Sequence, residues 1–176
     1  MRHCMKFPMP WLAAILVAAL GPQAANATWK TNSTTDPLTK EKHPYMSSAG
    51  QGAIRRFGHS VTSRLVVYCV PLPNQGVPFP SVDLWFSEKV AVGDLKARFR
   101  FDTGLVHVGE MESDSGNQFS LLRGLVGSEF NLYWDEFKTS NKLRIQVGLP
   151  WAGDTVIEFD TSGASEALDK IPCEER

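Results

Sequence analysis

The sequence predicts a mainly β protein: an antiparallel β-sandwich of about seven strands with one or two short helices and one disulfide. Three observations favour this fold class. Several segments alternate apolar and polar residues with the period of two that is typical of strands. Turn-forming residues separate these segments. One segment, residues 128–139, instead repeats its apolar residues with the period of a helix.

The amino terminus has the three parts of a secretory signal peptide. Arg2, His3 and Lys6 make a short positive region. Residues 11–20 (WLAAILVAAL) are apolar and uncharged, and residues 25–27 (ANA) form a small-residue cleavage site. A buried helix or an uncleaved anchor is the alternative. Ten apolar residues reach only about 15 Å as a helix, too short for a hydrocarbon core of about 30 Å. We therefore predict a signal peptide over 1–27, cleaved after Ala27.

The rest of the chain divides by composition into two regions. Residues 28–60 are rich in Ser, Thr, Gly and Pro without an apolar period, so they are predicted to form an extended polar arm. Trp29 is the exception and could pin this arm to the rest of the protein. Residues 61–176 carry the strand and helix patterns and are predicted to form one β-rich globular domain.

Four strands are predicted in the first half of this domain. Residues 63–70 (SRLVVYCV) are rich in β-branched and aromatic residues, as expected of a buried strand. Residues 82–87 and 96–101 alternate, and the second of these has one polar face. Residues 102–104 (DTG) are typical of a hairpin turn, so 105–109 are predicted to return as the partner strand.

The helix predicted over 128–139 has an aromatic stripe. The residues at its i, i+3, i+4 and i+7 positions are Phe130, Tyr133, Trp134 and Phe137. Such a stripe could be a platform for a ligand, but at this spacing it is more often the face that packs on a sheet. We therefore expect it to belong to the core.

Three more strands and a short helix complete the prediction. Residues 119–126 are a short apolar run, and 142–149 (KLRIQVGL) alternate more regularly than any other segment. Residues 154–160 follow a turn and are expected to pair with 142–149. Residues 163–170 are predicted to be a short helix that begins after a capping Thr or Ser.

Two cysteines remain after signal cleavage, Cys69 and Cys173. An even number of cysteines in an exported chain favours a disulfide between them. Closing a loop of about 104 residues would stabilise the fold by roughly 4–5 kcal/mol in the chain-entropy model. The alternative is two free thiols. A metal site is not expected, because neither cysteine has a second Cys or a His at ligand spacing.

Composition and motifs exclude several classes of function. The chain has 18 Lys and Arg residues against 19 Asp and Glu, so it lacks the basic excess of a nucleic-acid-binding protein. It has no apolar run of about 18 residues, so the mature chain is not predicted to span a membrane. A nucleophile elbow, a phosphate-binding loop and a zinc-protease helix are absent from the sequence. We expect no enzymatic activity, no catalytic residue and no cofactor.

The histidines and one pair of arginines are the remaining candidates for chemistry. His43, His59 and His107 have no ligand spacing with one another or with acidic residues, so no metal site is predicted. His107 lies between two valines in a predicted strand and is expected to face solvent. Arg98 and Arg100 lie on the polar face of their strand and could contact an anion or a partner, because guanidinium groups bind carboxylates and phosphates well. The alternative is an ordinary solvated strand face.

Several short motifs follow one another in a fixed order. They are Trp29 with DPL at 36–38, RLVVYC at 64–69, ARFRFD at 97–102, KLRI at 142–145, FDTSG at 159–163, AL at 167–168 and Cys173. This pattern resembles the TagO/VasI family, periplasmic accessory proteins associated with type VI secretion. The resemblance covers about two thirds of the mature chain. It implies a periplasmic location and a protein partner in the cell envelope, and it implies no catalytic residue.

The leading functional hypothesis is an exported, periplasmic, non-enzymatic accessory or binding protein that serves a type VI secretion system or other envelope machinery. The first alternative is a periplasmic inhibitor of a lysozyme-like cell-wall hydrolase. The second is a hydrolase with a dispersed site, which would require His59 or His107 to lie beside a carboxylate in a pocket. The sequence does not indicate an oligomeric state.

Overall fold

The computed structural model describes residues 29–35, 38, 40–52, 54–71, 78–113, 115–121, 128–171 and 173. The predicted signal peptide therefore lies outside the described residues. The described part contains eleven strands and two helices. They are β1 (Lys30–Thr35), β2 (Lys42–Gln51), β3 (Ile54–Arg56), β4 (His59–Val61), β5 (Ser63–Pro71), β6 (Pro78–Phe86), β7 (Leu95–Phe101), β8 (His107–Ser113), β9 (Gln118–Ser120), α1 (Ser128–Thr139), β10 (Lys142–Leu149), β11 (Gly153–Asp160) and α2 (Ala164–Leu168).

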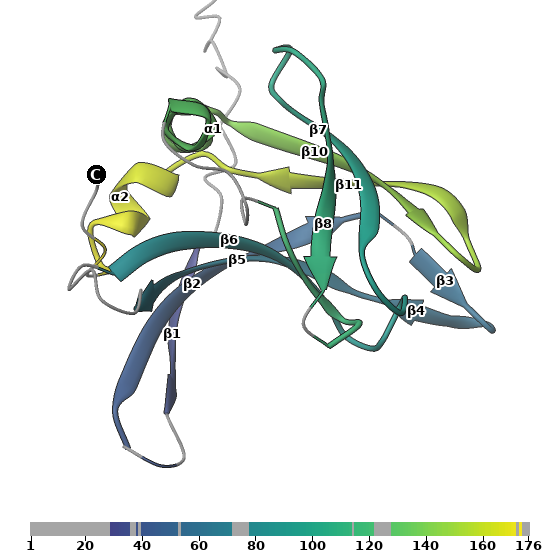
Figure 1. The fold of residues 1–176 in the computed structure, drawn as a ribbon, viewed down its shortest axis with the longest axis horizontal. Coiled ribbons are helices and arrows are strands. Elements are labelled where there is room, and N and C mark those ends of the chain that lie inside the picture. The colour runs from purple at the N-terminus through teal and green to yellow at the C-terminus, as the bar shows by residue number, and fades with distance from the viewer. Residues whose placement is uncertain are drawn as a thin grey trace, which may run out of the picture.

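The main sheet closes on itself as an eight-stranded antiparallel barrel (Figure 1). Around the ring the order is β2, β11, β10, β7, β8, β9, β6 and β5, and β5 pairs again with β2. The fold class was predicted correctly as mainly β, but the predicted sandwich is wrong. Two strands join what would have been separate layers, because β9 pairs with both β6 and β8, and β2 pairs with both β5 and β11.

Residues 28–60 contribute more than the extended polar arm that their composition predicted. They contain β1, β2, β3 and the first two residues of β4, and β2 is one of the eight strands of the ring. On one edge β2 pairs with β5; on the other it pairs first with β1 and then, at only two residue pairs, with β11. The β1–β2 hairpin extends away from the barrel (Figure 1). Trp29, just before β1, donates its indole N–H to the carbonyl of Ser162 at 3.1 Å.

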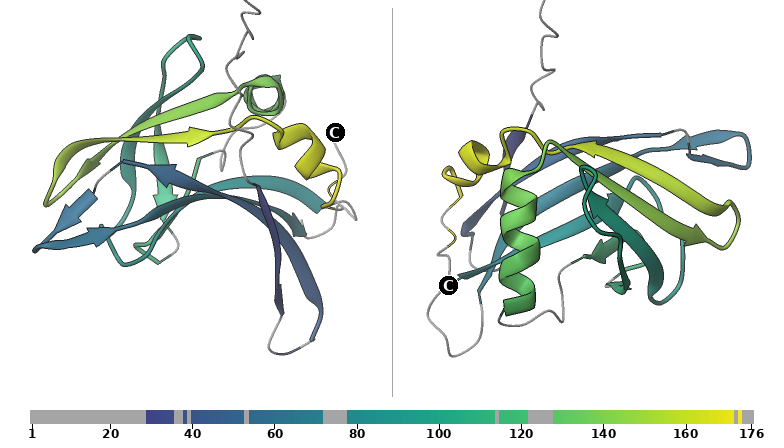
Figure 2. Two further views of the ribbon diagram at one scale, coloured as in Figure 1. Left: turned by 180° about the vertical axis from the view of Figure 1, so that it is seen from behind. Right: turned by 90° about the horizontal axis from the view of Figure 1, so that it is seen from above.

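The two ends of the barrel differ in what they carry. Helices α1 and α2 lie together at one end, and the β3–β4 hairpin and the β10–β11 turn lie at the other (Figures 1 and 2). The structure confirms the helix predicted over 128–139 and shortens the second one to Ala164–Leu168. Neither helix is long and apolar enough to cross a bilayer.

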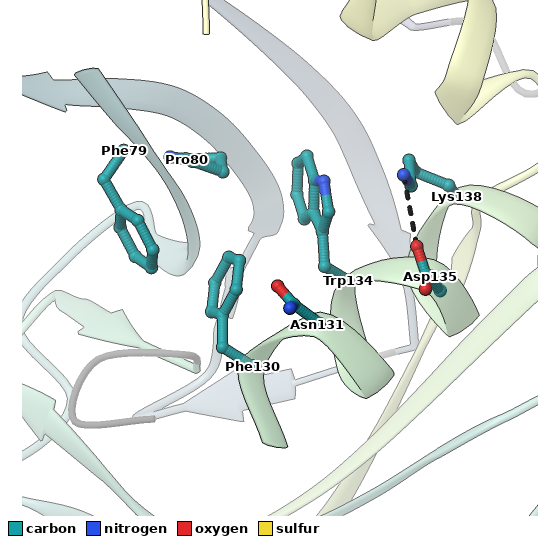
Figure 3. Close-up of a pocket in the computed structure, with 7 residues that line it drawn as sticks. All are labelled: Phe79, Pro80, Phe130, Asn131, Trp134, Asp135 and Lys138. Atoms are coloured by element: carbon teal, nitrogen blue, oxygen red, sulfur yellow. Dashed lines mark ion pairs between the residues drawn. The ribbon is translucent and has the colours of Figure 1, made fainter. Parts of the chain in front are cut away.

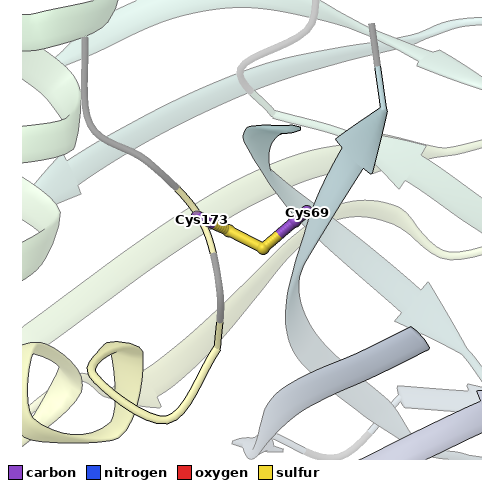
Figure 4. Close-up of a disulfide and its surroundings, with 2 residues drawn as sticks. All are labelled: Cys69 and Cys173. Atoms are coloured by element: carbon purple, nitrogen blue, oxygen red, sulfur yellow. A yellow bond between two sulfur atoms is a disulfide. The ribbon is translucent and has the colours of Figure 1, made fainter. Parts of the chain in front are cut away.

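The predicted disulfide is present. Cys69 on β5 is bonded to Cys173, which follows α2, with 5.5 Å between their Cα atoms (Figure 4). The bond ties the segment after α2 to a strand of the ring. Closing a loop of 104 residues restricts the unfolded chain, which stabilises the fold by roughly 4–5 kcal/mol in the chain-entropy model.

Candidate functional site

Strands β7 and β10 carry arginines on the outside of the barrel. Residues alternate along β7, so Phe99 is buried while Arg98 and Arg100 lie on the outer face. The register with β10 places Arg100 opposite Arg144 and Arg98 opposite Gln146. Like charges directly opposite each other on a sheet repel. The fold therefore holds two guanidinium groups side by side in an arrangement that an anion would stabilise.

Glu158 on β11 offsets part of this charge. Its carboxylate lies 2.6 Å from Lys142 Nζ and 2.7 Å from Arg144 Nε. The hydrogen bonds from Lys142 and from Arg144 lower the pKa of Glu158 below its usual value. The ionised carboxylate of Glu158 thus pairs with two cations, Lys142 and Arg144. It does not contact the arginines of β7.

Among the described residues, Arg98 and Arg100 have no counter-ion. Neither makes an ion pair or a hydrogen bond in the part of the chain that the structure describes. Together with Arg144 they line a shallow hollow of about 240 Å³. Its other walls are Phe99, Val106, Gln146 and Val156. We call this hollow the arginine groove.

Exposed valines surround the arginine groove. The exposed fractions of Val106, Val108 and Val156 are 48%, 76% and 56%. Val108 lies directly opposite Arg98 in the register of β7 and β8. Exposed aliphatic groups next to unpaired guanidinium groups are suited to a partner that brings both a negative charge and apolar surface.

Val106 and Val108 are exposed because β8 faces the opposite way from the prediction. The expectation that His107 faces solvent is wrong: only 11% of its side chain is exposed. Its ring packs edge-on against Tyr133 at 4.5 Å, and its Nε2 lies 3.2 Å from a carboxylate oxygen of Glu136. Because α1 supplies both an aromatic ring and a hydrogen-bond partner, the imidazole is satisfied beneath the helix. Val106 and Val108 consequently face outward.

A second hollow continues the arginine groove along the sheet. It has a volume of about 540 Å³ and shares Arg98 and Gln146 with the groove. Lys96, Asp94 and Asp154 also line it. Because both acidic residues lie here, the excess of positive charge is concentrated at the end formed by the arginine groove.

The outer face of β5, β6 and β9 carries a polar cluster of a different kind. Asp83 is 1% exposed and accepts hydrogen bonds from Tyr68 Oη at 2.8 Å, Ser81 Oγ at 2.9 Å and Gln118 Nε2 at 2.8 Å. Three donors on three strands satisfy one buried carboxylate. This arrangement holds the strands together and offers no open position to a ligand.

The aromatic stripe of α1 belongs to the core, as predicted. Phe130 and Trp134 are 5% exposed, and the Phe130 ring lies 4.3 Å from that of Phe79 on β6. A hollow of about 150 Å³ remains beside them (Figure 3). At its rim Lys138 pairs with Asp135 at 3.2 Å. The rings that line this hollow pack on one another and do not present an open face for stacking.

The structure does not bring the three histidines together. His43, His59 and His107 lie on β2, β4 and β8, which do not pair with one another. His59 contacts Glu88 at 3.1 Å on the surface. Neither His59 nor His107 lines any of the three hollows described above. Among the residues of known position, no group of three or more His, Cys, Asp or Glu side chains could hold a metal ion.

Sequence reasoning identified Arg98 and Arg100 but missed their neighbours. The alternation of β10 already placed Arg144 on a polar face, and the alternation of β11 did the same for Glu158. What the sequence did not show is that β10 is the neighbour of β7. The outward direction of Val106 and Val108 had no signal in the sequence, because a valine–histidine–valine segment predicts the reverse.

No protein-family model, no curated protein and no solved structure matches this chain. The arginine groove is therefore the feature on which a functional proposal rests.

Proposed function

We propose that this protein is an exported, non-enzymatic binding protein of the cell envelope whose arginine groove binds an acidic partner protein. The observation that carries the proposal is the absence of a counter-ion for Arg98 and Arg100 among the described residues. Arg100 lies opposite Arg144 across the β7–β10 pair, and Arg98 lies opposite Gln146. A carboxylate of a partner would relieve the repulsion and form charge-assisted hydrogen bonds.

A protein partner suits the groove better than a small anion. The groove is shallow, and Val106 and Val156 line it with exposed side chains. Val108, opposite Arg98 on β8, is exposed next to it. Arginine is enriched at the energetically important centre of protein–protein interfaces, and the exposed valines add apolar contact area around it. The proposed partner surface therefore combines Asp or Glu side chains with small apolar ones.

The chemistry of the groove favours binding over catalysis. Its cations are arginines, and a guanidinium group is suited to binding anions and not to general acid or base catalysis. Glu158 is held ionised by Lys142 and Arg144, so its carboxylate is engaged in ion pairs. The groove can thus orient an anion, and the proposal assigns it no bond-breaking step.

The location and the type of machinery are parts of the same proposal. Export to an oxidising compartment is supported by the disulfide between Cys69 and Cys173 and by the signal-peptide pattern of residues 1–27. Service to a type VI secretion system or to another envelope complex rests on the resemblance to the TagO/VasI family. Under this proposal, the partner is an envelope protein with an acidic surface.

The test is affinity capture from a periplasmic extract with matched arginine variants. We expect the wild-type protein to retain an envelope protein with an acidic surface, and the double variant Arg98→Gln with Arg100→Gln to lose at least about tenfold in affinity. Arg64→Gln is the control, because Arg64 is also an exposed strand arginine but lies on β5, away from the groove. Binding should weaken as the salt concentration rises. Equal capture by wild type and double variant would refute the role of the groove.

The same variants test inhibition of a lysozyme-like hydrolase. Catalytic clefts of glycosidases carry a pair of carboxylates, and the unpaired Arg98 and Arg100 would complement such a pair. If the protein inhibits a panel of lysozymes at micromolar concentration and the double variant does not, the acidic partner is the hydrolase. If no member of the panel is inhibited, this alternative fails and the envelope partner remains.

A further inference from the structure

The β3–β4 hairpin turns through an unusual residue. The turn residues Phe57 and Gly58 both have positive φ angles, 47° and 88°. A two-residue turn of this kind is normally formed by Asn-Gly or Asp-Gly, because other side chains disfavour a left-handed backbone. A bulky residue in this conformation is a genuine outlier. Phe57 therefore strains the turn relative to the residues that usually occupy it.

The fold gains little from this phenylalanine. Phe57 is 89% exposed, so its ring is not part of the core. Residues held in strained conformations persist where the surrounding structure determines them, and they are concentrated at functional positions. An exposed aromatic ring on a strained turn thus points to contact with another molecule and not to a role in stabilising the fold.

Neighbouring residues hold the tip of the hairpin in place. The guanidinium of Arg56 lies 5.5 Å from the centre of the Phe57 ring and 5.4 Å from that of Trp151. Arg56 also donates to the carbonyl of Lys89 and pairs with Glu88 at 3.5 Å. These contacts support the base of the Phe57 ring and leave its outer surface free.

This tip lies at the end of the barrel that is distant from α1 and α2, beside the β10–β11 turn (Figures 1 and 2). Trp151 of that turn donates its indole N–H to the carbonyl of Val90 at 2.9 Å. Two residues further on, Val92 is fully exposed. The same end of the barrel thus presents an aromatic ring and an aliphatic side chain to solvent.

Positive charge predominates next to the exposed ring. Arg55, Arg56 and Lys89 carry three positive charges, and Glu88, which contacts Arg56 and His59, carries one negative charge. Among these four side chains the balance is 3 − 1 = +2; Asp94 and Asp154, which line the hollow with Val92, are not part of this count. Apolar side chains that project from a cationic surface are the chemistry by which peripheral proteins attach to anionic bilayers.

We propose that the β3–β4 tip docks this protein on a bilayer surface that contains anionic phospholipid. Phe57 enters the interface between head groups and acyl chains, with Val92 at its edge. Arg55 and Lys89 lie at the level of the phosphates. The tip projects from the barrel, so it suits insertion into a soft surface. This site is separate from the arginine groove, and its test does not depend on the partner proposed above.

The experiment is co-sedimentation of the protein with vesicles of phosphatidylglycerol and phosphatidylethanolamine, and with vesicles of phosphatidylcholine. Wild type and variants are purified in the same form, so that any contribution from residues 1–27 is common to all of them. Phe57→Asn removes the ring and places a residue that favours the left-handed turn. We expect this variant to bind anionic vesicles about tenfold more weakly or worse, with a melting temperature that is unchanged or higher.

Two further variants make the result specific. Leu132→Asn changes an exposed apolar residue, 55% exposed, on α1 at the opposite end of the barrel, and it should leave vesicle binding unchanged. Arg55→Gln should lower the affinity for anionic vesicles by roughly fivefold and have no effect on phosphatidylcholine vesicles. The proposal is overturned if wild type and Phe57→Asn sediment equally, or if wild type does not bind anionic vesicles at millimolar lipid. If Phe57→Asn weakened binding to a partner protein but left vesicle binding unchanged, the tip would be assigned to a protein partner instead.

Discussion

The outer surface of the barrel carries two polar clusters that handle charge in opposite ways. On β5, β6 and β9, the carboxylate of Asp83 is buried and receives three hydrogen bonds from the protein itself. On β7 and β10, Arg98 and Arg100 lie on the surface without a counter-ion among the described residues. The first cluster is complete, and the second has room for an anion from outside.

This difference separates a structural role from a binding role. Removing one partner from a complete buried network leaves the other groups without hydrogen bonds, which costs stability. Removing a charge that has no internal partner leaves nothing unsatisfied. Substitutions at Asp83 should therefore change the free energy of unfolding, and substitutions at Arg98 or Arg100 should change binding.

The largest effect is expected for Asp83→Ala. It leaves the hydroxyls of Tyr68 and Ser81 and the amide of Gln118 without their acceptor, so we expect a loss of about 3 kcal/mol in unfolding free energy. Urea unfolding followed by circular dichroism measures it. Asp83→Asn is the control, because it keeps one acceptor and should cost less. If the unfolding free energy fell by no more than it does for an ordinary surface substitution, the network would not have a structural role.

Tyr68→Phe removes one hydrogen bond from the same network. A hydrogen bond to a charged group contributes about 1.5–3 kcal/mol, and Gln118 Nε2, at 2.8 Å from the same oxygen, retains part of the interaction. We expect a loss of about 1.5 kcal/mol in unfolding free energy, measured in the same urea titration. A value equal to that of Asp83→Ala would mean that Tyr68 alone carries the network.

Glu158→Gln tests a residue that has an ion-pair partner in the protein and also lies next to the arginine groove. Because the folded-state pKa of Glu158 is lowered, its contribution is present above the ordinary pKa of a glutamate and is lost as the pH falls through the folded-state value. For a partly exposed ion pair we expect a loss of about 0.5 kcal/mol at pH 7.

The same variant releases Arg144 from its carboxylate and should strengthen binding of an acidic partner. Unfolding curves at pH 7 and at pH 3 provide the check, since the difference from wild type should shrink at the lower pH. A stability difference that is independent of pH would contradict the ion-pair assignment.

The smallest effect, and one of opposite sign, is expected for Arg100→Gln. Removing the repulsion between Arg100 and Arg144 should raise the unfolding free energy by roughly 0.3 kcal/mol. The melting temperature at low and at high salt measures it, because screening should reduce the gain. If this variant were clearly less stable than wild type, Arg100 would have a structural role and the contrast between the two clusters would fail.

Local patterns predicted those parts of the fold in which one face of an element is apolar and the other polar. The alternation of residues 96–101 and 142–149 gave β7 and β10, and the helical period gave α1 with its observed bounds. The pairing of Cys69 with Cys173 followed from their being the two cysteines that would be left after the predicted cleavage. Each of these predictions needed only short-range information or a count.

Closure of the barrel could not be predicted in this way. It depends on β2, whose sequence KHPYMSSAGQ is polar and contains a proline. In the structure Met46 is fully buried, and Ser47 and Ser48 are 5% and 4% exposed. These small polar residues are buried because β2 pairs along both of its edges, which is a tertiary property. The inward direction of His107 depends in the same way on α1.

The ring of strands has one short join, where β2 meets β11 through Gly50 opposite Phe159 and Gln51 opposite Glu158. A Cβ atom at position 50 would collide with Ser63 Oγ and with the Phe159 ring unless these side chains shifted, so glycine lets the two strands meet there without displacing them. If this strand pairing were lost, the barrel would become an open sheet with two unpaired edge strands. Exposed edge strands can pair with strands of other chains. We therefore expect a larger residue at position 50 to open the ring and to promote self-association.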